Sequence, residues 1–199
     1  MKLSDAKKLL SEYVTSNTLQ RHCLTVSVVL GYWAKLLKEE DVEFWECVGL
    51  LHDIDYEQFP DQHCVKAKDI FEKEKANYPG ITDELIHAVQ SHGWEICCDV
   101  EPVHRMEKVL FTIDELTGLI FACAMARPSR SVMDMEVKSV MKKFKTPAFA
   151  AGCNRDVIKK GMSIMMDSIL DLTQEDIIQN CILAMRTRAG ELGVGMCYT

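Results

Sequence analysis

A series of apolar residues at helical spacing is the feature that most constrains the fold. Its members follow one another at intervals of 4, 3, 4, 3 and 4 residues: Leu19, Cys23, Val26, Leu30, Trp33 and Leu37. This spacing places every member on one face of an α-helix, and Asn17 or Thr18 is positioned to open that helix. The segment can bury its apolar face only by packing against other elements.

The remaining segments also predict helices. No alternating run rich in Val, Ile and Thr indicates a strand, and no internal repeat is visible. A further helix is expected from about Ser131 to Phe144. Residues that can start the other helices are found at intervals along the chain: Ser4, Asp41, Asp61, Thr82, Asn154 and Thr173. We therefore expect an all-α, single-domain bundle of about nine helices over residues 1–190, and a poorly ordered tail over residues 191–199.

The composition is that of an ordinary soluble domain, with 199 residues, 48% hydrophobic and 27% charged. The longest apolar run, from Leu116 to Ala126, contains Thr117 and Gly118 and is too short to span a bilayer. The N-terminus lacks the apolar stretch of a signal peptide. The expected location is the cytoplasm, and no membrane partner is expected.

Nine cysteines are present, an odd number without a Cys-x-x-Cys pair. Cys97 and Cys98 are adjacent, while most others lie in helix-like segments. This usage favours reduced thiols that serve as small hydrophobic residues.

The charge is unevenly distributed. The net charge of the chain is −7, but residues 127–160 contain nine Lys and Arg against three Asp and Glu. An acidic chain with one basic segment is a poor general nucleic-acid binder and a reasonable binder of one small anion. Lys142, Lys143 and Arg155 are the candidate phosphate contacts, although lysines near a helix C-terminus also simply favour its dipole.

Four polar residues occupy positions where a buried helix face would carry apolar side chains. They are His22, His52, Asp53 and Asp114. Singly, each has an ordinary explanation, such as a core histidine satisfied by hydrogen bonds. Together, two imidazoles and two carboxylates form a mixed nitrogen and oxygen set that suits Zn, Mn, Fe or Mg. One metal site would explain all four.

The motif Leu50-Leu51-His52-Asp53-Ile54-Asp55, with His22 before it and Asp114 after it, resembles the HD-domain superfamily of metal-dependent phosphohydrolases. The similarity covers about residues 17–126, which would form the metal-site core, with 127–190 as a helical extension. The resemblance implies that His22, His52, Asp53 and Asp114 bind a divalent metal.

It also implies hydrolysis of a phosphate ester or anhydride of a small molecule, for instance a nucleotide, by a metal-activated water. Asp53 would take part in this chemistry, and Asp55 and Glu57 are candidates for orienting or deprotonating the water. This chain has Asp55 where many relatives have Gly, which makes the two acids candidates; the alternative that both are solvated loop residues is equally well supported by the sequence.

His63 and His92 are candidates for a second metal, or for hydrogen bonds to the substrate phosphate. His87 lies five residues before His92, ~140° around a helix, so the two cannot face one site. His87 and His104 are expected at the surface. Tyr56 and Trp94 follow candidate ligands closely, and either line the pocket or pack in the core.

Three other functions remain in competition. A non-catalytic HD domain would bind a nucleotide or metal as a regulatory module, and a helical scaffold would need neither. An oxygenase with two irons also exists among similar proteins and ranks below hydrolysis. The metal, the substrate and a homo-oligomeric state are left open by the sequence.

Overall fold

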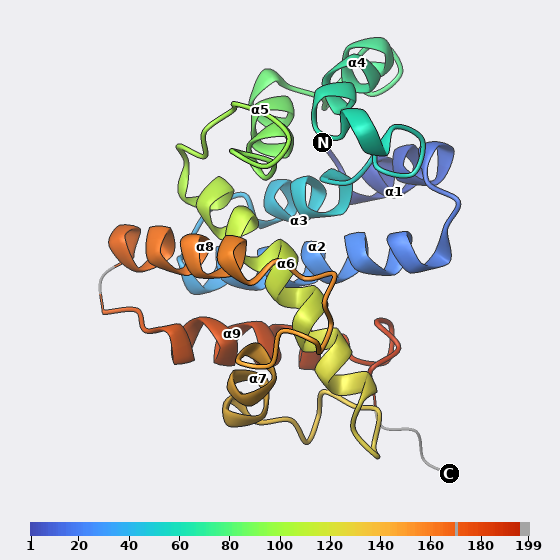
Figure 1. Ribbon diagram of the computed structural model, residues 1–199. Coiled ribbons are helices and arrows are strands. Elements are labelled where there is room, and N and C mark those ends of the chain that lie inside the picture. The colour runs from blue at the N-terminus through green and yellow to red at the C-terminus, as the bar shows by residue number, and fades with distance from the viewer. Residues whose placement is uncertain (170, 196–199) are drawn as a thin grey trace. The chain divides into compact units, whose positions relative to one another are not determined.

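The computed structural model describes residues 1–169 and 171–195, and these residues form an all-α fold (Figure 1). Within them the only β-type pairing is an isolated bridge between Trp94 and Cys98. The part of the chain that the structure describes contains nine α-helices: α1 (Leu3–Tyr13), α2 (Asn17–Leu36), α3 (Val42–Leu51), α4 (Val65–Glu74), α5 (Asp83–Ser91), α6 (Arg105–Met125), α7 (Val137–Phe144), α8 (Arg155–Ser168) and α9 (Gln174–Thr187). The all-α prediction is confirmed.

The chain divides into two compact units, residues 1–111 and 112–199. The division falls within α6, so this helix begins in the first unit and ends in the second. The expected single domain and its boundaries at residues 126 and 190 stay predictions. None of the helices among the described residues is long and apolar enough to cross a membrane.

In the first unit, α3 packs on α1, α2 and α5, and α5 packs on α4 (Figure 1). The apolar face of α2 that the sequence indicates is buried, because Cys23, Val26, Leu30 and Trp33 have no exposed surface. Burial of such side chains is worth about 1.5–3 kcal/mol each before conformational entropy is counted. This packing holds the ends of α2, α3 and α5 in fixed positions.

Glycine allows α3 to approach α2 closely. A Cβ atom on Gly49 would lie 2.8 Å from the Cα atom of Ser27, a distance that real Cβ atoms do not reach. The Ser27 hydroxyl donates a hydrogen bond of 2.7 Å to the carbonyl oxygen of Glu46, so the two helices also bond at this crossing. Gly49, where the two helices meet, lies three residues before His52 in the sequence.

Several predicted helix starts are confirmed. The side chains of Asp41, Thr82, Asn154 and Thr173 each accept a hydrogen bond from a backbone N–H in the first turn of α3, α5, α8 and α9. Thr173 also forms a capping box with Asp176, which satisfies a further backbone donor.

Other predicted starts differ from the structure. Ser4 lies inside α1, which begins after Lys2 without a side-chain cap, and Ser16 caps α2. Asp61 belongs to a short 3-10 helix, η1 (Pro60–Gln62), rather than to α4. The cause is His63, whose extended ψ of 145° interrupts the helix before α4 begins.

In the second unit, α9 packs on α7 and α8. The helix expected from Ser131 begins only at Val137, because the preceding segment bonds to the C-terminal segment instead. The Ser131 hydroxyl and the Val132 N–H both donate to the carbonyl oxygen of Val194. Leu192 and Val194 are buried, so this part of the expected tail is packed; residues 196–199 lie outside the described residues.

Candidate metal centre

The centre of the candidate site is the end of α3, where His52 caps the helix and Asp53 follows it. His52 has no exposed surface, and Asp53 is 7% exposed. The helix ends here because the chain turns through residues 52–58 instead of continuing. The turn directs both side chains into the interior, where uncompensated polar groups cost several kcal/mol.

Four imidazoles surround the Asp53 carboxylate, two on each oxygen. The Oδ2 atom lies 3.4 Å from Nε2 of His52 and 3.5 Å from Nε2 of His22. The Oδ1 atom lies 3.3 Å from Nε2 of His63 and 3.6 Å from Nε2 of His92. Asp53 therefore stands between two histidine pairs, supplied by α2 and the end of α3 on one side and by the segments before α4 and after α5 on the other.

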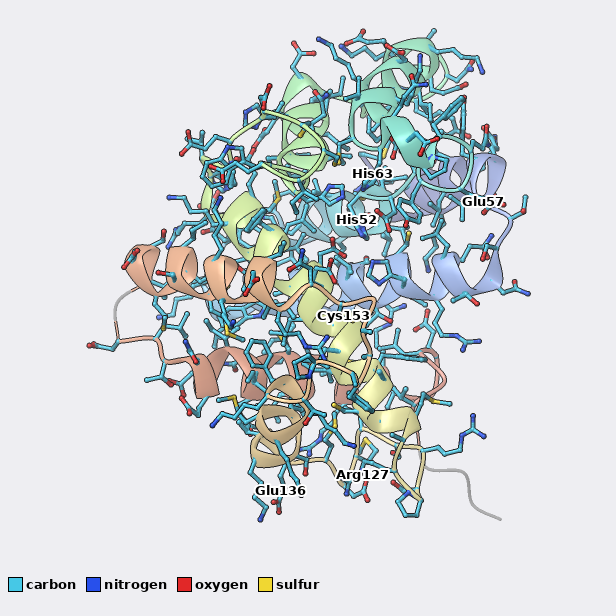
Figure 2. All side chains as sticks on the ribbon, viewed as in Figure 1. His52, Glu57, His63, Arg127, Glu136 and Cys153 are labelled. Carbon is cyan, nitrogen blue, oxygen red and sulfur yellow. The ribbon has the colours of Figure 1, made fainter. Side chains whose placement is uncertain are left out.

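The Nε2 atoms also meet within each pair. They lie 3.2 Å apart in His22 and His52, and 3.0 Å apart in His63 and His92. Adjacent rings meet edge to face, with centroids 4.9–5.1 Å apart. Figure 2 shows His52 and His63 directed toward the same region of the first unit.

Hydrogen bonds on the far side of three rings define their tautomers. In His52, the Nδ1 atom lies 2.8 Å from the carbonyl oxygen of Gly49. In His92, the Nδ1 atom faces the carbonyl oxygen of Val89. In His63, Nδ1 lies 2.8 Å from Oδ1 of Asp55. Since carbonyl and carboxylate oxygens only accept, each of these Nδ1 atoms carries a proton, and the Nε2 atom of the same ring faces the cluster.

This donor set fits a metal ion. Four Nε2 atoms lie within 3.3–3.6 Å of one buried carboxylate, and His52, Asp53 and His92 offer ligand atoms within 4.8 Å of one another, a mixed imidazole and carboxylate set that suits a divalent metal ion. Burial by itself raises the pKa of Asp53, but the imidazoles of His52, His92 and His22 outweigh burial and hold this pKa well below its usual value. The carboxylate is therefore ionised and available as a ligand.

Asp55 positions His63 and is fully buried. Its side chain has no exposed surface, and its second oxygen accepts a hydrogen bond of 2.8 Å from the Ala67 N–H in the first turn of α4. Both oxygens are thus occupied within the protein. Burial lowers the pKa of His63, but the hydrogen bond that its Nδ1–H donates to Asp55 and the charge of Asp53 raise this pKa overall. A direct role of Asp55 toward water stays a prediction, while its contact with His63 is a feature of the structure.

Glu57 is not brought to the cluster. Its carboxylate accepts hydrogen bonds from the backbone N–H groups of Thr15 and Ser16, both at 2.9 Å, and from the Thr15 hydroxyl. These bonds lower the pKa of Glu57 and tie the connection between α1 and α2. Figure 2 places Glu57 apart from His52 and His63.

The other predicted site residues belong to the second unit. Asp114 lies on α6 and is half-buried, and its place in the ligand set stays a prediction. Lys143 lies over the ring of Phe149, 4.4 Å from its centroid. The Arg155 guanidinium donates to three backbone carbonyl oxygens, those of Phe149, Ala150 and Cys153.

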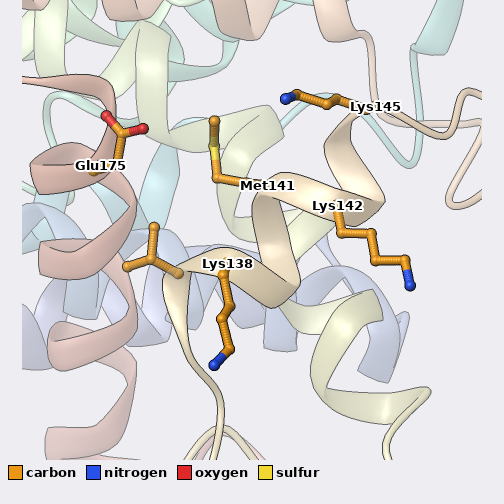
Figure 3. A pocket seen from close by; sticks show the side chains of 6 residues that line it. Lys138, Met141, Lys142, Lys145 and Glu175 are labelled. Carbon is orange, nitrogen blue, oxygen red and sulfur yellow. The ribbon is translucent and has the colours of Figure 1, made fainter.

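Lys142 lines a surface pocket between α7 and α9, together with Lys138, Lys145 and Glu175 (Figure 3). The three lysine side chains point in different directions and do not converge on one point (Figure 3). Phosphate binding by Lys142, Lys143 and Arg155 therefore stays a prediction.

His87 is half-buried: its Nδ1 lies 2.6 Å from Oε1 of the buried Glu107. His104 is exposed. The Trp94 ring packs edge-on against Phe111, whereas Tyr56 is 48% exposed with its ring edge-on to His63, 5.0 Å between centroids. Tyr56 thus lies at the surface next to the cluster, and Trp94 is half-buried against Phe111.

A group of thiols that no sequence pattern indicates lies beside the second histidine pair, His63 and His92. Cys64, which follows His63, has its sulfur 3.7 Å from Nε2 of His92, and the Cys97 sulfur lies 3.4 Å from that of Cys64. Cys64 and Cys97 are 33 residues apart in the sequence, so residue spacing does not indicate that their side chains are neighbours.

The fold and the site define a helical protein whose His and Asp side chains are arranged to hold metal. Residues 19–117 match the family model of the HD domain. This segment contains all four residues that the resemblance named as ligands, and the chain belongs to the HD-domain superfamily. No curated protein and no solved structure gives a significant match to the chain.

Proposed function

We propose that this protein is a metal-dependent phosphohydrolase that cleaves a phosphate ester or anhydride of a small molecule. The observation that carries the proposal is the Asp53 carboxylate, which has one histidine pair on each oxygen. Asp53 and the two histidine pairs would hold up to two divalent ions, which would supply Lewis acidity and an activated water, as in two-metal phosphatases. HD-domain membership supports the same chemistry.

His22, His52 and Asp53 would hold one ion, with Asp114 as the proposed fourth ligand. His63 and His92 would hold a second ion on the other oxygen of Asp53. The alternative is that both rings carry a proton on Nε2 and donate hydrogen bonds to the substrate phosphate, and the raised pKa of His63 is compatible with that protonation. The donor set suits Mn, Fe or Zn better than Mg, which prefers oxygen ligands.

A divalent ion at this centre supplies Lewis acidity toward a phosphoryl oxygen and lowers the pKa of a coordinated water. The chain's own residues fix the geometry in which that happens. The carbonyl oxygens of Gly49 and Val89 and the carboxylate of Asp55 each accept a hydrogen bond from Nδ1 of one histidine. These bonds hold the orientation of the three rings. Burial of Asp53 and His52 keeps bulk water away from one side of the centre.

The substrate would approach from the side of Tyr56, whose exposed ring lies against His63. A ring of this kind can pack on a base or another flat group of the substrate. This placement favours a nucleotide or similar compound over inorganic polyphosphate. We expect Tyr56→Ala to raise KM severalfold with little change in kcat.

The test is phosphate release from a panel of nucleotides, sugar phosphates and other small phosphorylated compounds, by protein loaded with Mn²⁺, Fe²⁺ or Zn²⁺. The proposal predicts turnover of at least one compound that depends on metal and is lost in Asp53→Ala. Binding of a nucleotide without any turnover, by protein that holds metal, would instead support a non-catalytic regulatory HD domain.

A further inference from the structure

Three cysteines from two separate segments meet beside the candidate metal centre. Cys64 lies directly before α4, and Cys97 and Cys98 lie in the turn that follows α5. The Cys97 sulfur is 3.4 Å from that of Cys64, which is van der Waals contact. The Cys98 thiol also interacts with Cys64 and Cys97, and it donates a hydrogen bond of 3.0 Å to the carbonyl oxygen of Gln90.

The backbone provides the space for this sulfur pair. A Cβ atom on Gly93 would lie 2.5 Å from the sulfur of Cys64 and 2.5 Å from that of Cys97, so any larger residue there would displace one or both. Cys64 itself has a φ of 65°, in the left-handed region that a residue with a side chain adopts only at some cost. Cys64 is also tied to α5, since Gln90 donates to its carbonyl oxygen at 3.2 Å.

We propose that Cys64 and Cys97 are a thiol pair that a peroxide oxidises to a disulfide. A sulfur–sulfur bond is about 2.0 Å long, so closure requires the two sulfurs to approach by roughly 1.4 Å. Cys97 is exposed and Cys64 is buried. Cys97 is therefore the thiol that a dissolved oxidant reaches, and Cys64 is the thiol placed to resolve the product.

The reaction balances with hydrogen peroxide as the oxidant. The Cys97 thiol releases its proton, the thiolate attacks one peroxide oxygen and the O–O bond breaks, which gives a sulfenic acid on Cys97 and a hydroxide that takes up the released proton as water. The Cys64 sulfur then attacks the Cys97 sulfur, the S–O bond breaks, and the leaving hydroxide takes up the Cys64 proton as water. Overall, two thiols lose two protons and two electrons, and one peroxide becomes two waters.

The disulfide would join the chain just after His63 to the turn just after His92. It would close a loop between residues 33 positions apart, and a cross-link over such a loop stabilises a fold chiefly by restricting its unfolded state. The two segments that carry the second histidine pair would then be covalently linked. The proposal does not depend on the proposed function, because it concerns the thiols alone.

The experiment treats the purified, metal-loaded full chain with a small molar excess of hydrogen peroxide and measures its intact mass. We expect a loss of about 2 Da that a dithiol reductant reverses. Trypsin should yield one cross-linked species made of residues 39–66 and 76–105, with fragment ions that place the bond on Cys64 rather than Cys47. The oxidised protein should unfold at a temperature several degrees higher.

Two variants make the test specific. Cys97→Ser changes an exposed side chain and should abolish the cross-link, whereas Cys98→Ser, its neighbour in the same turn, should leave the cross-link intact. A bond between Cys97 and Cys98, a cross-link that persists in Cys97→Ser, or oxygen addition to Cys97 without any cross-link would each overturn the proposal. None of these measurements uses metal content or hydrolysis. A negative result for the thiol pair can therefore be told apart from a negative result for the proposed function.

Discussion

The carbonyl oxygen of Gly49 accepts a hydrogen bond of 2.8 Å from Nδ1 of His52, and Gly49 is also the point where α3 approaches the backbone of α2. One residue thus fixes the orientation of a candidate metal ligand and the distance between the helices that carry His22 and His52. The absence of a side chain at residue 49 is a requirement of the site as well as of the core.

Gly49→Ala should lower the free energy of unfolding by about 1–3 kcal/mol, because the new methyl group overlaps the Ser27 backbone and the helices must separate. Alanine would otherwise stabilise a helix relative to glycine by about 0.5–1 kcal/mol. The measurement is chemical denaturation of both proteins.

Gly31→Ala is the matched control on α2. Its methyl group would meet the side chain of Glu46, which is half-buried and can move, rather than backbone. The effect should therefore be smaller. Equal stability of Gly49→Ala and the wild type would show that the close approach does not constrain α2 and α3.

Asp55→Asn should weaken metal binding at the His63 side by about 10–100-fold. The asparagine side chain has one acceptor oxygen for two donors, Nδ1 of His63 and the Ala67 N–H. His63 would lose its fixed tautomer, or a buried donor would stay unpaired at a cost of about 1–3 kcal/mol. Metal titration by calorimetry measures the first effect.

Glu57→Gln is the control for this change, since Glu57 is also an acid of the turn after α3 but contacts Thr15 and Ser16 instead of the cluster. Its metal affinity should equal that of the wild type. A loss of metal in Glu57→Gln as large as in Asp55→Asn would contradict the placement of both residues.

Glu74 should make stability depend on pH in the acid range. Its carboxylate is 6% exposed and accepts hydrogen bonds from the Tyr13 hydroxyl at 2.6 Å and the Asn77 amide at 2.9 Å, and Lys73 lies 3.2 Å away. These contacts lower the pKa of Glu74 to about 2, from an ordinary value of 4.5. Because the folded pKa is the lower one, the stabilisation is complete above pH 4.5 and is lost as the pH falls toward 2.

Glu74→Gln should accordingly lower the unfolding temperature most at pH 7, with a difference from the wild type that shrinks steadily below pH 4.5. Thermal unfolding at pH 7, 5, 4 and 3 measures this. Glu72→Gln on the same helix removes only a surface pair with Lys75 and should change little at any pH. A difference for Glu74→Gln that stays constant from pH 7 to 3 would exclude this account.

The sequence predicted the helices well because their apolar spacing and caps are local features. The caps at Asp41, Thr82, Asn154 and Thr173 need only neighbouring residues. The start of α7 was predicted six residues too early, because Ser131 bonds to Val194, 63 residues away. A contact of that range leaves no signal in the local pattern.

The sequence indicates which types of residue form the candidate site. It indicates much less about the hydrogen-bond partners of those residues. His22, His52 and Asp53 follow from polar side chains on apolar helix faces together with the family resemblance. A helix that starts at Asp61 would include His63, but His63 precedes α4 and reaches Asp53 from a residue with a ψ of 145°. The roles of Asp55 and Glu57 depend on donors at Ala67 and Thr15, which no spacing rule connects to them.

The central claim is that Asp53 joins two histidine pairs in a metal centre. The most direct measurement is the metal content of the purified protein by plasma mass spectrometry, before and after incubation with Mn²⁺, Fe²⁺ or Zn²⁺. We expect about two ions per chain in the wild type, and near-complete loss in Asp53→Asn.

His87→Gln is the control, because this histidine pairs with Glu107 outside the cluster and its loss should leave the metal content unchanged. One ion per chain would restrict metal to one histidine pair and leave the other for the substrate. Wild-type protein that holds no metal after all three incubations, or Asp53→Asn that holds as much as the wild type, would contradict the account.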